Sequence, residues 1–309
     1  MATSNSYNFT VNRDEIIYFA LRKLTVLKRG QTPAAEDISD AAIALNMIVQ
    51  QWRERSDGAA SMKMWLRKRL KLFFALNQVK YSIPGDNITE VSELVTTTLT
   101  AAASSTTLTV ASITGIASGD YAGIVENSGS ITWTTVNGAP SGSTVTLTAG
   151  VTAAAIGNKC YFYTTPAVAP VSIIGANLVT PVDQETPLGV FDIGAYWAIG
   201  NKNAAGVPSG LYQERARDSL DIYFDTAIND TGYVVNLLVH YPIQDFDAST
   251  DNPDFPKQWF RALGYMLAVD LAPEYGMPLG DLSTLAADAI AMARGSDPET
   301  TDLSFDSSS

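Results

Sequence analysis

The sequence is poor in the side chains that most often carry chemistry, because its 309 residues include one cysteine, Cys160, and one histidine, His240. A single cysteine excludes an internal disulfide and a zinc site made of several cysteines. A serine triad could be built only through His240, and the Gly-x-Ser-x-Gly turn of serine hydrolases is absent. Phosphate-binding glycine loops of the P-loop and dinucleotide types are absent as well. We therefore predict a protein that is not an enzyme and that has no cofactor.

The remaining candidates for chemistry have ordinary structural interpretations. Cys160 and His240 both fall in predicted strands, where a small buried thiol and an unpartnered imidazole need no catalytic explanation. Residues 245–251 place oxygen side chains at every second position, as in a calcium loop. However, Thr250 stands where that loop requires glycine, and Pro256 stands where it requires glutamate. We interpret this segment as a helix-entry loop and predict no metal site.

Long apolar runs are also missing, since no stretch approaches the length that crosses a bilayer. Residues 1–11 are polar and do not have the basic start and apolar centre of a secretion signal. We therefore expect a protein made in the cytoplasm with no membrane partner.

Charge is unevenly distributed along the sequence, whose net charge is −12. Residues 1–80 hold 13 Lys and Arg against 7 Asp and Glu, whereas residues 81–309 hold 7 against 25. The pattern predicts a basic surface in the N-terminal part that faces an anionic partner. It also predicts that the remainder of the molecule is acidic.

Two helices are predicted near the N-terminus. Asn12 followed by Glu15 forms a capping box, and the apolar periodicity after it predicts a helix that ends at Gly30. Thr32 and Pro33 open a second helix that runs to Trp52. We expect these helices to pack as an antiparallel pair.

A basic cluster follows the second helix. Its members are Arg53, Arg55, Lys63, Arg67, Lys68, Arg69 and Lys71. One interpretation is a surface that neutralises DNA phosphates, without sequence specificity. The other is a solvated face or a subunit interface, and the sequence leaves both open. Residues 72–76 and 79–83 then predict a β-hairpin.

Composition changes abruptly between residues 94 and 166, where Thr, Ala, Val, Ser and Gly dominate. Short alternating segments separated by glycine turns predict a small all-β module. The predicted strands are 94–100, 106–111, 121–126, 131–136, 144–148 and 160–164.

The rest of the chain predicts three strands, at 171–179, 219–224 and 233–241, and then a helical hairpin. Asp254 and Pro256 suit the start of its first helix, and its second helix runs over 279–294. The predicted fold is α+β, with a helical core of two N-terminal helices and the C-terminal hairpin, short strands, and an inserted β barrel or sandwich. The predicted divisions are 1–93 and 167–295 for the main domain, 94–166 for the insert, and 296–309 for an extended arm.

The hairpin region closely resembles a known family. The runs Pro253-Asp-Phe-Pro-Lys-Gln-Trp and Leu271-Ala-Pro-Glu-Tyr-Gly-Met-Pro, followed by an alanine-rich helix, are similar to the C-terminal part of head-to-tail adaptors of short-tailed bacteriophages. These adaptors are also called tail accessory or packaged-DNA stabilisation proteins. Residues 13–24, 42–52, 206–212 and 299–306 resemble the same family.

The resemblance implies a virion protein of the phage neck, assembled in the host cytoplasm as a ring of about twelve copies. The ring would bind the portal protein above and the tail nozzle below, surround packaged double-stranded DNA, and help to retain it. Trp259, Leu263, Leu285 and Ala289 of the hairpin are candidates for packing against a neighbouring copy. Leu303 and Phe305 are candidate anchors of a docking arm that orders on binding.

Two other functions stay open at this stage. The first is a tail-associated carbohydrate- or receptor-binding protein that uses the insert, whose candidate stacking aromatics are Tyr121, Trp133, Tyr161 and Tyr163. The second is a cell-wall hydrolase, which only the abundance of carboxylates favours.

Overall fold

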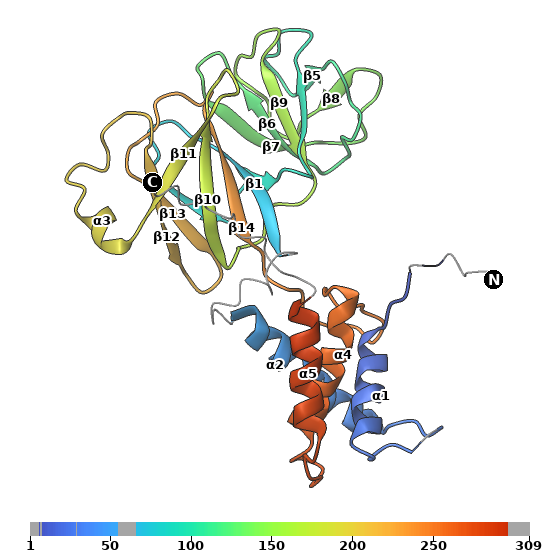
Figure 1. Cartoon of the computed structure of the whole chain (residues 1–309). Helices are drawn as coiled ribbons and strands as arrows, with labels where there is room; N and C mark the ends of the chain where they lie inside the picture. The colour runs from blue at the N-terminus through green and yellow to red at the C-terminus, as the bar shows by residue number, and fades with distance from the viewer. Residues whose placement is uncertain (1–5, 7, 29, 55–65, 296–309) are drawn as a thin grey trace, which may run out of the picture. The chain divides into compact units, whose positions relative to one another are not determined.

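The computed structural model describes residues 6, 8–28, 30–54 and 66–295, with residues 53 and 54 described by their backbone alone. The chain divides into two compact units (Figure 1). One unit joins both ends of the chain, Met1–Leu66 and Pro242–Ser309, and the other is Arg67–Tyr241. We call them the helical unit and the β unit. The predicted limits of the insert, residues 94 and 166, both fall within the β unit.

The helical unit is organised around one central helix, α4, which packs against all three other helices (Figure 1). Its elements are α1 (Arg13–Lys23), α2 (Ala35–Glu54), η2 (Lys257–Trp259), α4 (Phe260–Leu271) and α5 (Leu282–Gly295). Apolar side chains of all four α-helices form one core, in which the Trp52 ring meets Trp259 and Phe255 edge to face. The four helices predicted from capping and periodicity are therefore confirmed.

The capping box predicted at the start of α1 is confirmed as well. The Asn12 side chain accepts a hydrogen bond from the Glu15 N–H at 2.9 Å, and the Glu15 carboxylate accepts one from the Asn12 N–H at 2.9 Å. The predicted end of this helix is wrong. Thr25 has a φ of 62°, a left-handed conformation that stops the helix at Lys23, well before Gly30.

Eight strands of the β unit form one nearly closed, barrel-like sheet in the order β2-β13-β12-β11-β10-β14-β1-β3. Their bounds are β1 (Arg67–Phe73), β2 (Lys80–Ile83), β3 (Ile88–Glu90), β10 (Ser172–Val179), β11 (Glu185–Phe191), β12 (Gly210–Arg215), β13 (Leu220–Phe224) and β14 (Val234–His240). A short helix, α3 (Ile193–Trp197), precedes β12. Alternation places Leu220, Ile222 and Phe224 in the core while Asp221 and Tyr223 point the other way.

Two smaller sheets lie within the predicted insert. One has the order β4-β9-β6-β7 and the other pairs β5 with β8. Their bounds are β4 (Val95–Thr98), β5 (Thr107–Thr109), β6 (Tyr121–Val125), β7 (Ile131–Thr135), β8 (Thr144–Thr146) and β9 (Lys159–Tyr163). All six strands predicted for this region are confirmed.

The predicted fold class is wrong. The described residues form fourteen strands in three sheets and four helices longer than six residues, so the fold is mostly β, and the helices form the core of one unit only. The error has a physical cause. The large sheet is assembled from strands far apart in the sequence, since β1 pairs with β14 and β2 pairs with β13, and local periodicity carries no signal for such pairing.

The predicted hairpin of residues 72–76 and 79–83 is wrong for the same reason. β1 pairs with β14 and β3, while β2 pairs with β13 at the other end of the strand order. The two segments are joined by a turn in which Asn77 has a φ of 60°. The Tyr81 hydroxyl steadies this turn by accepting a hydrogen bond from the Ala75 N–H at 3.0 Å.

The uneven charge along the sequence does not become an uneven charge between the units. The helical unit, residues 1–66 and 242–309, holds 11 Lys and Arg against 19 Asp and Glu, and the β unit holds 9 against 13. Both units are acidic, because the fold joins the basic N-terminal segment to an acidic C-terminal one. Any basic surface is therefore local, confined to a part of one unit. None of the helices within the described ranges is both long enough and apolar enough to cross a bilayer.

Candidate functional site

The helical unit contains a groove of about 630 Å³ between α1 and the start of α4. We call it the α1–α4 groove. Its lining residues are Phe9, Val11, Glu15, Ile16, Phe19, Arg22, Lys23, Lys257, Phe260, Arg261 and Gly264. The floor is therefore apolar and aromatic, whereas four of the lining residues carry positive charge and one carries negative charge.

The depth of the groove depends on a glycine at its base. A Cβ added to Gly264 would lie 2.5 Å from the Phe19 ring, so a larger residue would push α1 away from α4. Phe19 also meets Tyr265 edge to face, with ring centroids 5.3 Å apart. At the mouth, Phe9 packs against Phe260 at 6.4 Å but keeps 66% of its surface exposed.

Basic side chains hold fixed positions on the rim of the groove. The Lys23 ammonium lies over the Phe19 ring at 5.1 Å, and the Arg261 guanidinium lies over Tyr265 at 5.3 Å. Arg22 donates from Nε to the Tyr18 carbonyl at 3.2 Å. Among the described lining residues, the carboxylate belongs to Glu15, and it accepts the capping bond from the Asn12 N–H. An anionic ligand with an apolar group matches this arrangement.

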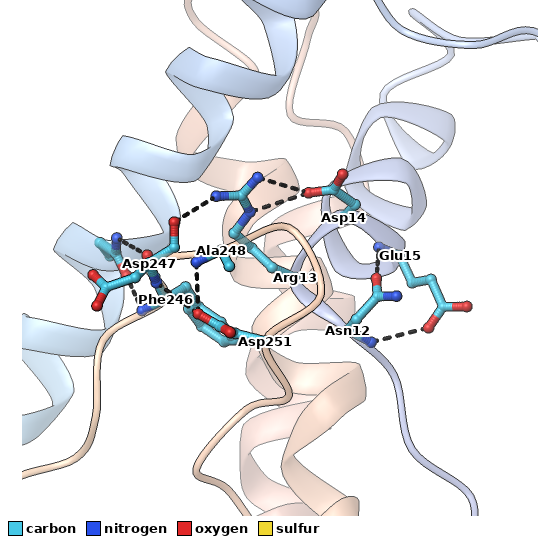
Figure 2. A network of polar contacts seen from close by, with 9 residues as sticks. Asn12, Arg13, Asp14, Glu15, Phe246, Asp247, Ala248 and Asp251 are labelled. Carbon is cyan, nitrogen blue, oxygen red and sulfur yellow. Dashed lines mark hydrogen bonds and ion pairs between the residues drawn. The ribbon is translucent and has the colours of Figure 1, made fainter.

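The first turn of α1 is held by the loop that was considered as a calcium site (Figure 2). Asp251 accepts hydrogen bonds through its carboxylate from the N–H groups of Asp247 at 2.9 Å and Ala248 at 2.6 Å. Its carbonyl accepts the Arg13 N–H at 2.9 Å, and Arg13 also forms an ion pair with Asp14 at 2.9 Å. The loop carboxylate thus serves to position α1. Within the described residues, no cluster of three metal-binding side chains occurs.

Asp254 does not cap the following helix, so that prediction is wrong. Its carboxylate accepts the Gln244 N–H at 3.3 Å instead, and η2 begins after Pro256 without a side-chain cap. The helix therefore opens with a 3-10 turn before α4.

The four residues predicted to pack against a neighbouring copy differ in how deeply they are buried. Trp259 and Leu263 are fully buried in the core of the helical unit, and Ala289 is nearly so, whereas Leu285 is 37% exposed on α5. Other apolar side chains that the sequence reasoning missed are more exposed. They are Ile43 and Met47 on α2, at 54% and 65%, and Met292 on α5, at 70%.

The basic cluster is split by the alternation of β1. Lys68 forms an ion pair with Glu90 at 2.8 Å and lies over the Tyr241 ring at 4.2 Å. Arg69 and Lys71 point to the opposite face. Arg67 is half-buried. The side chain of Arg53, together with Arg55 and Lys63, lies outside the described residues, as do Leu303 and Phe305 of the arm.

Arg69 and Lys71 line a second groove, of about 440 Å³, on the outer face of the large sheet. Across it, the Glu185 carboxylate accepts hydrogen bonds from the side-chain amides of Asn177 and Asn236, both at 2.8 Å. This carboxylate reduces the positive potential that the two basic residues create. The groove is therefore a mixed polar surface and only a modest phosphate site.

Cys160 and His240, the single cysteine and histidine of the sequence, both lie within strands. Cys160 is buried in the small sheet, and burial raises the pKa of its thiol to about 12, which keeps it protonated and unreactive. His240 Nδ1 lies 3.2 Å from the Ser172 hydroxyl on the neighbouring strand.

The insert aromatics proposed for sugar stacking pack mainly within the β unit. Trp133 and Tyr161 lie against Phe73 of β1, with centroids 5.5 and 4.3 Å apart, and Tyr163 is buried and stacks on Tyr121. They join the small sheet to the large one.

A more exposed aromatic surface lies at α3, which the sequence reasoning missed. Trp197 is 70% exposed, and Lys202 lies over its ring at 5.4 Å. Next to it Tyr196 stacks on Tyr212, with centroids 5.2 Å apart.

The α1–α4 groove was not predicted, because its residues come from two segments about 240 positions apart in the sequence. The available signal was the exposed pair Arg22 and Lys23 on a helix whose other face is apolar. Comparison with protein-family models finds no matching family, and a search of curated proteins finds no matching sequence.

Proposed function

We propose that the chain is a structural virion protein, a head-to-tail adaptor that forms a ring with copies of itself between the portal and the tail nozzle. The proposal draws on the resemblance of residues 253–294 to adaptor proteins. The observation that carries it is the exposed apolar surface of the helical unit, namely Ile43, Met47, Leu285 and Met292.

The spacing of these residues supports a packing role. Ile43 and Met47 are four residues apart and share one face of α2, while Leu285 and Met292 are seven residues apart and share one face of α5. Large apolar side chains gathered on helix faces are typical of surfaces that a partner covers. In a ring each copy uses two different surfaces, one for each neighbour. Two exposed helix faces meet that requirement.

Retention of DNA is the second part of this proposal. Arg69 and Lys71 are the described members of the basic cluster that face a groove, whereas Lys68 is committed to Glu90. We expect weak, salt-dependent contact with phosphates and no sequence preference. Changing Arg69 to glutamate should lower DNA retention in particles while ring assembly stays normal. Loss of the ring itself would assign this strand to the interface.

The test of the adaptor function is incubation of the purified chain with portal rings, followed by electron microscopy and mass measurement. A ring of the chain stacked on the portal is the expected result. If the chain stays free of the portal under conditions where portal rings are intact, the adaptor function is rejected.

A receptor-binding tail protein is the second candidate, and the exposed Trp197 with its neighbour Lys202 is the observation that favours it. Aromatic faces of this kind stack on apolar faces of ligands. Binding to a glycan array that Trp197→Ala abolishes, together with no binding to the portal, would replace the adaptor function with this one.

A further inference from the structure

We propose that the α1–α4 groove is the docking site for the chain's own C-terminal segment, residues 296–309 of the same molecule. Before assembly, residues 296–309 would then fill the groove of their own molecule. This inference does not depend on the portal or on ring formation.

Charge complementarity is the first argument. The described lining of the groove includes Arg22, Lys23, Lys257 and Arg261, and the carboxylate among these lining residues, Glu15, already accepts the Asn12 N–H. Residues 296–309 contain four acidic residues, Asp297, Glu299, Asp302 and Asp306, and no basic residue. Both units of the protein are acidic, so this basic rim is an exception to its surroundings. It attracts an acidic segment in preference to the rest of the surface.

The apolar content of the two partners also matches. Leu303 and Phe305 are the only large apolar residues of the segment, and each has an acidic neighbour, Asp302 or Asp306. The groove offers an aromatic floor bounded by Phe19 and Phe260, with cations on its rim. A ring on the floor and carboxylates at the rim would satisfy both partners. This arrangement resembles the aromatic anchors of tight protein interfaces.

The path of the chain favours the same molecule over a neighbour. α4 and α5 run from a shared turn, so α5 ends at the end of the unit where α4 begins (Figure 1). α5 also contacts η2, whose Lys257 lines the groove. Phe305 is ten positions beyond Gly295, and a chain of that length can span up to about 33 Å, several times the radius of a helix. The short connection gives the segment a high effective concentration at its own groove.

The experiment uses the full chain with a photoreactive benzoylphenylalanine in place of Phe305. After irradiation, mass spectrometry identifies the peptides that it has joined. The expected partners are peptides from α1 and from the start of α4. Isotope-labelled and unlabelled protein are mixed beforehand, and docking within one molecule predicts crosslinks between peptides of the same isotope only.

Charge variants make the test specific. Arg22→Glu with Arg261→Glu should lower the crosslink yield about tenfold, because each change replaces an attraction by a repulsion. Adding Asp302→Lys and Asp306→Lys should restore it, which also shows that the variant groove is folded. Lys28→Glu removes an exposed cation of the helical unit that does not line the groove, and the yield should stay unchanged.

Three results would overturn the proposal. Crosslinks of mixed isotope would place the segment in the groove of a second copy. Crosslinks scattered over the surface, or confined to the β unit, would show that the groove is not its site. An equal yield in the charge-reversed protein would remove the electrostatic basis. None of these results bears on portal binding, which is measured separately.

Discussion

At the scale of single residues, Gly264 sets the distance between α1 and α4. In the middle of a helix, alanine is favoured over glycine by about 1 kcal/mol. Here the added Cβ meets Phe19 at 2.5 Å, and overpacking costs about 1–3 kcal/mol. We expect Gly264→Ala to lower the free energy of unfolding by about 1 kcal/mol, as measured by denaturant titration.

The matched control is the same change in a Phe19→Ala background. Alanine lacks the Cγ, Cδ and Cε atoms that the new Cβ would meet, so Gly264→Ala should then be neutral or stabilising. A loss of the same size in both backgrounds would show that the contact with Phe19 is not the cause.

Buried phenols and the thiol make stability depend on alkaline pH. Burial raises the pKa of Tyr81, Tyr161 and Tyr241 to about 12, and that of Cys160 to about 12. Burial, and then the hydrogen bond to Asp37, raise the pKa of Tyr275 to about 12. The unfolded chain loses these protons first, near pH 10 for tyrosine and near pH 9 for cysteine.

The stability that these groups contribute is therefore complete below about pH 9 and is lost as the pH rises towards 12. We expect the denaturation midpoint to fall steadily across that window. Tyr275→Phe should make the fall shallower, and at neutral pH it should cost about 1 kcal/mol through loss of the bond to Asp37. A midpoint that does not change between pH 9 and 12 would contradict this assignment.

At the scale of elements, the loop of residues 245–251 positions the start of α1. Asp251→Ala removes the carboxylate that accepts the N–H groups of Asp247 and Ala248. Charged hydrogen bonds of this kind contribute about 1.5–3 kcal/mol, so we expect a loss of that order in the free energy of unfolding. Asp247→Ala removes an equal charge from the same loop but keeps these bonds, and it should change stability little. Equal losses would show that charge alone is responsible.

The elements that sequence reasoning predicted correctly are those with a local signal. The capping pair Asn12 and Glu15, and the alternation of the insert strands, are features of neighbouring residues. β11 and β12 were not predicted, because β11 contains Pro187 and is mostly exposed, and β12 follows Gly206, Pro208 and Ser209, which are typical of turns.

Gly210 itself explains why that segment forms a strand. A Cβ there would meet the Phe191 ring at 2.4 Å and the Gly189 carbonyl at 2.8 Å, so only glycine allows β12 to pair in parallel with β11. The shape of the α1–α4 groove had no local signal beyond the exposed pair Arg22 and Lys23, since it depends on which distant helices meet. Of the four predicted packing residues in the C-terminal helical hairpin, Leu285 is the exposed one. In the basic cluster, Lys68 and Arg69 are adjacent in the sequence but point to opposite faces of β1.

At the scale of the whole molecule, the β unit begins and ends at paired residues. Arg67 and His240 are partners across β1 and β14, so their Cα atoms lie about 5 Å apart. A short linker can therefore replace the whole β unit. We expect a chain in which about four Gly and Ser residues replace 67–241 to fold as a helical protein with cooperative thermal unfolding, measured by circular dichroism.

The excised segment 67–241 should likewise fold alone, with its own core and a β-type spectrum. If neither piece folds although the full chain does, each unit needs the other for its stability.

We have proposed that copies of the chain assemble through exposed helix faces of the helical unit. The most direct test measures the mass of complexes between portal rings and three forms of the chain: wild type, Met47→Lys with Met292→Lys, and Val182→Lys as a control. Val182 is a comparably exposed apolar residue of the β unit. We expect complete rings for wild type and the control, and none for the double variant. Rings of equal mass from all three, or from none, would contradict it.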